Sequence, residues 1–179
     1  LPTQLWLALR FVQSLTLIGA LLFKDREVNF YHLLAVYGGI TALLVGMIFG
    51  GIFPTAYIEG VGLTPFKVAS EYAIIGFSMV SIILLAIRRR ELDSHVFHLL
   101  VASSAVAIVS ELMFTLYSGV YDAFNLIGHY FSLISFYLVY KAVIETGLRR
   151  PFALLFRDLK QSEEALRRSE GVLRSVIGN

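Results

Sequence analysis

Five long stretches that carry little charge dominate this sequence, and they constrain its fold more than any other feature. A helix needs roughly 20 mostly apolar residues to cross the hydrocarbon core of a bilayer. The five stretches run from Thr3 to Phe23, Phe30 to Phe53, Phe66 to Ile87, His95 to Tyr117 and Phe124 to Val143. They are apolar all round, without the alternation of a membrane β-barrel. The sequence therefore predicts an all-α fold, a polytopic transmembrane bundle of five spans.

The composition excludes most classes of soluble protein. Apolar residues make up 57% of the chain and charged residues 16%, whereas a soluble domain of this size needs more charge to cover its surface. The chain has no cysteine, which excludes disulfides, thiolate metal sites and cysteine nucleophiles. Because the basic residues lie beside the apolar stretches, we expect membrane lipid as a partner and no nucleic acid.

The basic residues cluster in alternate connectors, which predicts the orientation of the chain. The connectors that carry them follow the first, third and fifth spans and contain Lys24 and Arg26, then Arg88, Arg89 and Arg90, then Lys141, Arg149 and Arg150. The positive-inside rule places these connectors in the cytoplasm. We therefore expect a multi-pass protein of the cell inner membrane with Leu1 outside and Asn179 inside. If the native N-terminus is cytoplasmic, an odd number of spans precedes Leu1, so we expect a chain truncated at its N-terminus.

Local signals mark helix ends and a smooth helix face. Thr64 followed by Pro65 is typical of an N-cap with proline at the first helical position, and Asp93 or Ser94 can cap the fourth span. Small residues recur every fourth position in the second span, at Gly38, Ala42, Gly46 and Gly50. This ridge favours close packing within one bundle over a dimerisation face of its own.

Ionisable residues inside the predicted spans need an explanation, because charge in a bilayer costs several kcal/mol. At a helical rise of about 1.5 Å per residue, Arg10, Glu71, Glu111 and His129 fall in one layer of the outer half of the membrane, with Gln13 and Asn125 as uncharged companions. One interpretation is a structural cluster of ion pairs and hydrogen bonds. The other is a ligand-binding or proton-sensitive site that opens to the outside. The candidate binding or sensing residues are Arg10, Glu71, Glu111, Asn125 and His129.

The sequence contains no recognisable catalytic constellation. It lacks a phosphate-binding glycine loop, a nucleophile elbow and a metalloprotease helix. We therefore predict no catalytic residues, no metal and no cofactor. A bis-histidine haem would need His32 and His98 at one depth on facing helices, but interfacial histidines usually meet head groups and water, so we expect no haem.

The C-terminal segment has the pattern of a signalling helix. Gly147 and Pro151 separate it from the fifth span, and apolar or small residues then alternate at four-three spacing: Phe152, Leu155, Leu159, Ser162, Leu166, Ser169, Leu173 and Val176. This spacing predicts a coiled coil and a homodimer, and serine in the seam suits a helix that shifts. The alternative is a single amphipathic helix on the membrane surface. We divide the chain into a sensor domain, 1–147, and a linker, 148–179, with Gly147, Pro151, Leu159, Leu166 and Leu173 as relay positions.

Several sequence strings carry a family resemblance. They run from Leu1 to Trp6, Gly62 to Lys67, Ser70 to Tyr72, Ser110 to Tyr117, Asn125 to His129 and Ser135 to Arg157. In this order they resemble the membrane-associated sensor family of the third type. The segment that follows Ser169 is similar to the opening of a PAS domain.

The resemblance implies an N-terminal sensory module of a bacterial or archaeal signalling protein, which relays an unknown stimulus to a PAS domain, histidine kinase or diguanylate cyclase. It implies further helices upstream of Leu1, and a fragment that is itself non-catalytic within a full-length enzyme. The alternative is a piece of an ion-coupled transporter or channel, which intramembrane carboxylates and a glycine ridge also fit. The sequence shows no internal repeat between spans, which counts against that alternative.

Overall fold

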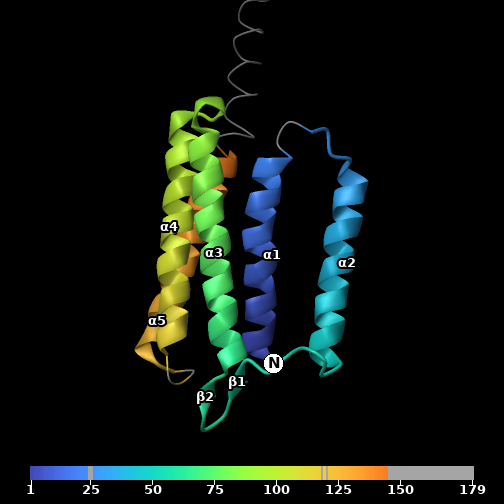
Figure 1. Cartoon of the computed structure of the whole chain (residues 1–179), viewed down its shortest axis with the longest axis vertical. Coiled ribbons are helices and arrows are strands. Elements are labelled where there is room, and N and C mark those ends of the chain that lie inside the picture. Colours follow the sequence, from blue (N-terminus) through green and yellow to red (C-terminus); the bar gives the residue numbers. More distant parts are fainter. Residues whose placement is uncertain (24–25, 118, 120, 145–179) are drawn as a thin grey trace, which may run out of the picture. The chain divides into compact units, whose positions relative to one another are not determined.

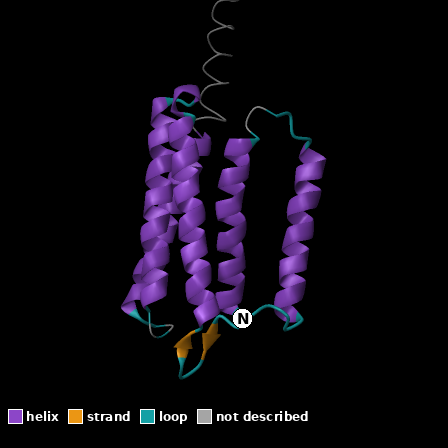
Figure 2. Ribbon diagram, viewed as in Figure 1, coloured by secondary structure: helices purple, strands orange, loops and turns teal. Residues whose placement is uncertain are grey.

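The computed structural model describes residues 1–23, 26–117, 119 and 121–144, and it confirms the predicted all-α fold. Five helices are long and apolar enough to cross a membrane (Figure 1): α1 (Pro2–Leu22), α2 (Phe30–Phe49), α3 (Pro65–Ile87), α4 (Ser94–Leu116) and α5 (Ala123–Ile144). A short 3-10 helix, η1 (Arg89–Glu91), links α3 to α4. A small hairpin of β1 (Tyr57–Ile58) and β2 (Gly62–Leu63) precedes α3 (Figure 2).

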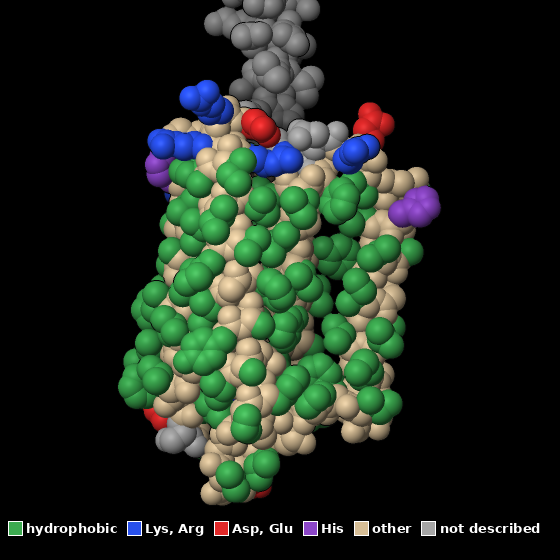
Figure 3. All heavy atoms as spheres, in the orientation of Figure 1, with side chains coloured by type: hydrophobic (Ala, Val, Ile, Leu, Met, Phe, Trp, Pro, Cys, Tyr) green, Lys and Arg blue, Asp and Glu red, His purple; other side chains and the backbone are tan. Residues whose placement is uncertain are grey.

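Residues 1–139 form one compact unit, and residues 140–179 are assigned to a second, of which the structure describes only the end of α5. In the first unit, α3 packs between α1 and α4, and α2 lies beside α1 (Figure 1). The hairpin lies at one end, which we call the hairpin end. Lys and Arg side chains gather at the opposite end of the apolar surface (Figure 3), in the connectors that hold Arg26, Arg88, Arg89 and Arg90.

Side-chain caps mark the starts of α3 and α4. The Thr64 hydroxyl accepts a hydrogen bond from the Lys67 amide at 3.2 Å, with Pro65 in the first turn of α3. Asp93 rather than Ser94 caps α4, because its carboxylate accepts from the His95 amide at 2.9 Å. These caps satisfy amides that have no partner within the helix.

The second helix ends at Phe49, earlier than the predicted end at Phe53. Gly51 has a φ of 71°, in the left-handed region that favours glycine and stops a helix. The amides of Ile52 and Phe53 then bond back to the Met47 carbonyl at 2.9 and 3.0 Å. Hydropathy alone extended the span through these residues because Ile52 and Phe53 are apolar.

Polar contacts fix the loop between α2 and α3 at the hairpin end. The Gln4 amide of α1 donates to the carbonyls of Phe53 and Pro54 at 3.1 and 3.0 Å. The Thr64 hydroxyl donates to the Thr55 carbonyl at 2.7 Å. Tyr57 of β1 stacks on buried Tyr117, with ring centroids 6.5 Å apart. The loop before the hairpin is thus attached to α1, and the hairpin itself contacts the end of α4.

The small-residue ridge of α2 has no close neighbour in the described part of the chain, so the close packing expected there stays a prediction. No described atom outside the helix backbone lies within 4 Å of the place where a Cβ at Gly38 or Gly46 would be. The polar link between α2 and α1 is the Tyr37 hydroxyl, which donates to the Thr16 hydroxyl at 2.7 Å.

The reason lies in which face of α2 turns toward its neighbour. The least exposed side chains of this helix are Tyr37, Leu44, Met47 and Ile48. At about 100° of rotation per residue, the ridge of Gly38, Ala42 and Gly46 falls on roughly the opposite side. Repetition at four-residue spacing identified a smooth face but not the direction in which it points.

Serine hydroxyls join α4 to α5. Ser103 and Ser135 bond reciprocally to each other's carbonyl oxygens, at 2.9 and 3.0 Å. Ser110 donates to the Gly128 carbonyl at 2.8 Å and lies 2.7 Å from the Ser132 hydroxyl. Small side chains let the two backbones approach, as at other membrane helix contacts. A Cβ at Gly128 would lie only 2.7 Å from Cε1 of Phe114, so this approach requires glycine.

We predict an alkaline loss of stability that depends on Tyr117, which lies just beyond α4. Its burial, and then its neighbour Tyr57, raises the pKa of the Tyr117 hydroxyl to about 12. In an unfolded chain this pKa is about 10, so above about pH 10 the unfolded state releases a proton that the folded state keeps. Stability therefore falls between about pH 10 and about pH 12, and Tyr117→Phe removes this part of the fall. Chemical unfolding of the protein in detergent at several pH values measures it, and Tyr121→Phe, at an exposed position, serves as the control.

We predict that Gly128→Ala destabilises the protein by about 1–3 kcal/mol, the usual cost of overpacking a core. The new methyl group would displace the Phe114 ring, which is 1% exposed. Gly76→Ala is the matched control, because nothing lies within 4 Å of its Cβ position and alanine favours a helix. Thermal unfolding in detergent compares the two, and equal melting temperatures would contradict the prediction.

Candidate functional site

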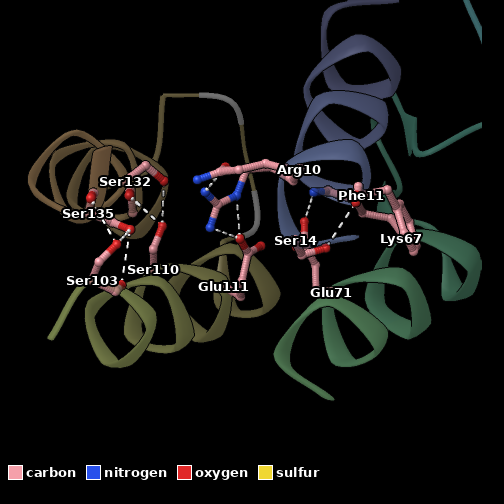
Figure 4. A network of polar contacts seen from close by, with 12 residues as sticks. Arg10, Phe11, Ser14, Lys67, Glu71, Ser103, Ser110, Glu111, Ser132 and Ser135 are labelled. Atoms are coloured by element: carbon pink, nitrogen blue, oxygen red, sulfur yellow. Dashed lines mark hydrogen bonds and ion pairs between the residues drawn. The ribbon is translucent and has the colours of Figure 1, made fainter. Parts of the chain in front are cut away.

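Four charged side chains are buried together between α1, α3 and α4. They are Arg10, Lys67, Glu71 and Glu111, with exposed fractions of 2%, 1%, 0% and 0%. We call this set the four-charge cluster (Figure 4). Buried charges occur in proteins almost only when they are paired, and here two positive groups face two negative ones.

The first pair joins the first helix to the fourth. The Arg10 Nε donates to Glu111 Oε1 at 2.5 Å, and its Nη2 forms an ion pair with the same oxygen. The third guanidinium nitrogen, Nη1, donates to the Gln13 side chain at 2.7 Å. All three nitrogens of Arg10 are therefore used, and the Arg10 Cζ also lies 5.7 Å from the ring centroid of Phe136 on α5.

The second pair lies within α3. Lys67 is in the first turn of this helix, directly after the Thr64 cap, and it forms an ion pair with Glu71 one turn later. A cation at a helix N-terminus is opposed by the helix dipole. The Glu71 carboxylate and the Phe114 ring, whose centroid is 5.6 Å from the Lys67 Nζ, offset that cost.

The two pairs act as one electrostatic unit. Lys67 interacts electrostatically with both Glu111 and Arg10, and Figure 4 shows Glu71 and Glu111 projecting toward α1 from α3 and α4. With all four groups ionised the formal charge of the cluster is zero. Removing one charge from such a set leaves another without its partner in a medium of low dielectric constant, which is strongly unfavourable.

The pairing is incomplete on the carboxylate side. Both Arg10 contacts use Oε1 of Glu111, and Lys67 contacts Oε1 of Glu71. Within the described residues, the Oε2 atoms of Glu71 and Glu111 are buried and have no hydrogen-bond partner. Each carboxylate therefore has an unused acceptor inside the protein.

An aromatic group lies beside the cluster. The Phe114 ring contacts both the Trp6 ring and the His129 ring, at centroid distances of 5.9 and 5.0 Å. The Trp6 and His129 rings are 4.7 Å apart. Phe114 is buried whereas His129 is exposed. The Nε1 of Trp6 is a buried donor without a partner among the described residues.

The structure brings together three of the five predicted site residues. Arg10, Glu71 and Glu111 meet as expected from their depth. His129 does not join the ion pairs but packs against rings, and Asn125 lies half-buried in the first turn of α5. The predicted relay positions Gly147, Pro151, Leu159, Leu166 and Leu173 lie outside the described residues.

Sequence reasoning missed Lys67, which is the second cation of the cluster. It had expected His129 in that role. Lys67 stands at the edge of its span, where a lysine usually reaches the interface. A usable signal was its spacing: Lys67 and Glu71 are four residues apart on one predicted helix face. The serines of α4 and α5 had no comparable signal, because hydroxyl groups are common in membrane helices.

The four-charge cluster is a set of paired charges. It contains no nucleophile paired with a base, and the described residues hold no group of three or more potential metal ligands. What it offers is a set of buried charges contributed by three helices. Any event that alters one of these charges changes the strength of the contacts between the three helices.

The chain is similar to a known protein family. A model of the MASE3 family, a membrane-associated sensor domain, matches residues 1–151 of the chain. No curated protein and no solved structure matches it. The matched range includes all five helices and the whole four-charge cluster.

We predict strong coupling between Arg10 and Glu111. Arg10→Leu alone leaves the Glu111 carboxylate buried without its cation, which costs about 3–5 kcal/mol. Adding Glu111→Leu removes the unpaired charge and restores most of that loss. A double-mutant cycle of unfolding free energies in detergent measures the coupling. Additive effects of the two substitutions would contradict the pairing.

Proposed function

The chain belongs to the MASE3 family of membrane-associated sensor domains, as its sequence motifs predicted, and we propose that it is the sensory input domain of a transmembrane receptor. In this proposal the stimulus acts on the four-charge cluster. It favours one of two helix arrangements that differ by a few kcal/mol, and thereby changes their populations.

The observation that carries this proposal is the burial of two ion pairs that involve three helices. A structural role alone does not require charge, because well-packed apolar residues often replace a buried ion pair without loss of stability. Buried charges in membrane helices are typical of functional sites. The cluster also lies toward the hairpin end, since Lys67 is only the third residue of α3.

The proposed path to the output runs through α4 and α5. Glu111 is next to Ser110, which bonds α4 to Gly128 and Ser132 of α5. A displacement of α4 at the cluster therefore acts directly on α5, and α5 leads along the chain to residues 148–179. We propose that this segment forms the coiled-coil linker of a homodimer and transmits the change to a PAS domain, histidine kinase or diguanylate cyclase.

The proposed orientation places the hairpin end outside the cell inner membrane. The gathering of Arg26, Arg88, Arg89 and Arg90 at the opposite end supports a cytoplasmic position for that end. Family membership favours the sensor over the transporter fragment that intramembrane carboxylates also allowed.

We predict that Glu111→Gln in the full-length receptor changes its basal output by about tenfold. Gln keeps the size of the side chain but removes its charge, and about 1.4 kcal/mol suffices to change a two-state ratio tenfold. Output is measured as the activity of the cytoplasmic enzyme in membranes, normalised to the amount of receptor. Glu59→Gln, on the exposed hairpin turn, is the control and leaves output unchanged. If Gln at Glu71, Glu111 and His129 in turn altered nothing, the site would be elsewhere.

A further inference from the structure

Two unused carboxylate oxygens lie inside the four-charge cluster. Oε2 of Glu71 and Oε2 of Glu111 are buried acceptors without a donor among the described residues. An acceptor left unsatisfied away from water is costly, and these two come from neighbouring helices, α3 and α4 (Figure 4). Both side chains are 0% exposed.

We propose that Glu71 and Glu111 form a proton-binding site and that the proton bound there is the stimulus of the sensor domain. This inference rests on the proposed function and adds the identity of the ligand. A proton from water forms an O–H bond with one free carboxylate oxygen. The resulting carboxyl group then donates to the free oxygen of the other carboxylate, so that one proton satisfies both acceptors.

Size favours a proton over other hydrogen-bond donors. The two free oxygens are covered by protein atoms, and a larger donor such as an amine would first have to displace them. A proton also acts on the charge balance. It changes the formal charge of the cluster from zero to +1 in an apolar environment, and that excess positive charge opposes the close approach of Arg10 and Lys67.

The groups that face this carboxylate pair come from each neighbouring helix. They are Arg10 from α1, Lys67 from α3 and, across the Phe114 ring, His129 from α5. The stacked Tyr57 and Tyr117 lie toward the hairpin end. The ion pair between Arg10 and the ionised form of Glu111 is what holds α1 to α4.

Protonation therefore weakens the bond between α1 and α4. In the unprotonated state Arg10 binds an ionised Oε1 of Glu111. Once the carboxylate pair shares a proton, its single negative charge is divided between two side chains, and Arg10 loses part of its partner. A shift of α1 away from α4 relieves the excess charge, which couples proton binding to helix position.

The first test measures protonation itself, independently of signalling. The full-length protein in lipid nanodiscs is titrated between acid and alkaline pH, and infrared difference spectra record the carbonyl stretch of buried protonated carboxyl groups. We expect a band that appears on acidification and is lost in both Glu71→Gln and Glu111→Gln, because sharing needs both carboxylates. Glu59→Gln keeps the band.

A charge-balanced double variant keeps the test valid if the single variants fail to fold. Arg10→Gln combined with Glu111→Gln removes one cation and one anion, so the cluster keeps its formal balance. This double variant also lacks the band if the proposal is right, while its melting temperature shows that it is folded. A band that survives in this folded variant overturns the proposal.

The second test measures helix position. The chain has no cysteine, so Leu9→Cys and Leu112→Cys, at exposed positions next to Arg10 and Glu111, can carry a pair of spin labels. We expect the distance between the labels to increase over the same pH range in which the infrared band appears. In the Glu111→Gln background we expect the distance to be independent of pH.

The outcomes separate this inference from the proposed function. A receptor whose output responds to Glu111→Gln but which shows no carboxyl band has a sensing cluster whose ligand is not a proton, and the inference fails alone. If the band and the distance change both occur but the output does not depend on pH, the inference also fails, because the bound proton then does not control signalling. Coincident pH midpoints of band, distance and output support it.

Discussion

The burial of four charges inside an apolar bundle is the constraint on which the rest of this structure depends. Arg10, Lys67, Glu71 and Glu111 have no access to water, so each needs an opposite charge at contact distance. This requirement fixes the rotation of α1, α3 and α4 about their axes, because each helix must turn its charged residue inward. Apolar packing between helices in lipid is weakly directional, whereas these ion pairs depend strongly on the direction of each side chain.

A second set of polar contacts, of a different kind, holds α4 to α5. The serine hydroxyls bond to carbonyls and to each other and need no balance of charge. The helix α4 thus carries an electrostatic contact through Glu111 and a hydrogen-bonded one through Ser110, side by side in the chain. In contrast, within the described part of the chain α2 is tied to α1 by the Tyr37 and Thr16 hydroxyls and takes part in neither set.

The sequence predicted the helices well and the site in part, for physical reasons that particular residues show. Hydropathy and length suffice for the number of spans, since the bilayer sets both, and unusual depth singled out Arg10, Glu71 and Glu111. Depth along a helix does not give the direction of a side chain, so His129 was assigned to the ion pairs although it is exposed on α5. Lys67 was missed because a lysine at the edge of a span is expected to reach water. The end of α2 was misplaced because it depends on the backbone conformation of Gly51.

The contact of Trp6 with Phe114 and His129 has an optical consequence. Trp6 is the single tryptophan of the chain, and its ring lies against the aromatic group that covers Lys67. Indole emission depends on the polarity around the ring and is quenched by a neighbouring charged imidazole. The indole fluorescence of the unmodified chain therefore arises from one place, beside the buried charges, and the protein carries its own spectroscopic label there.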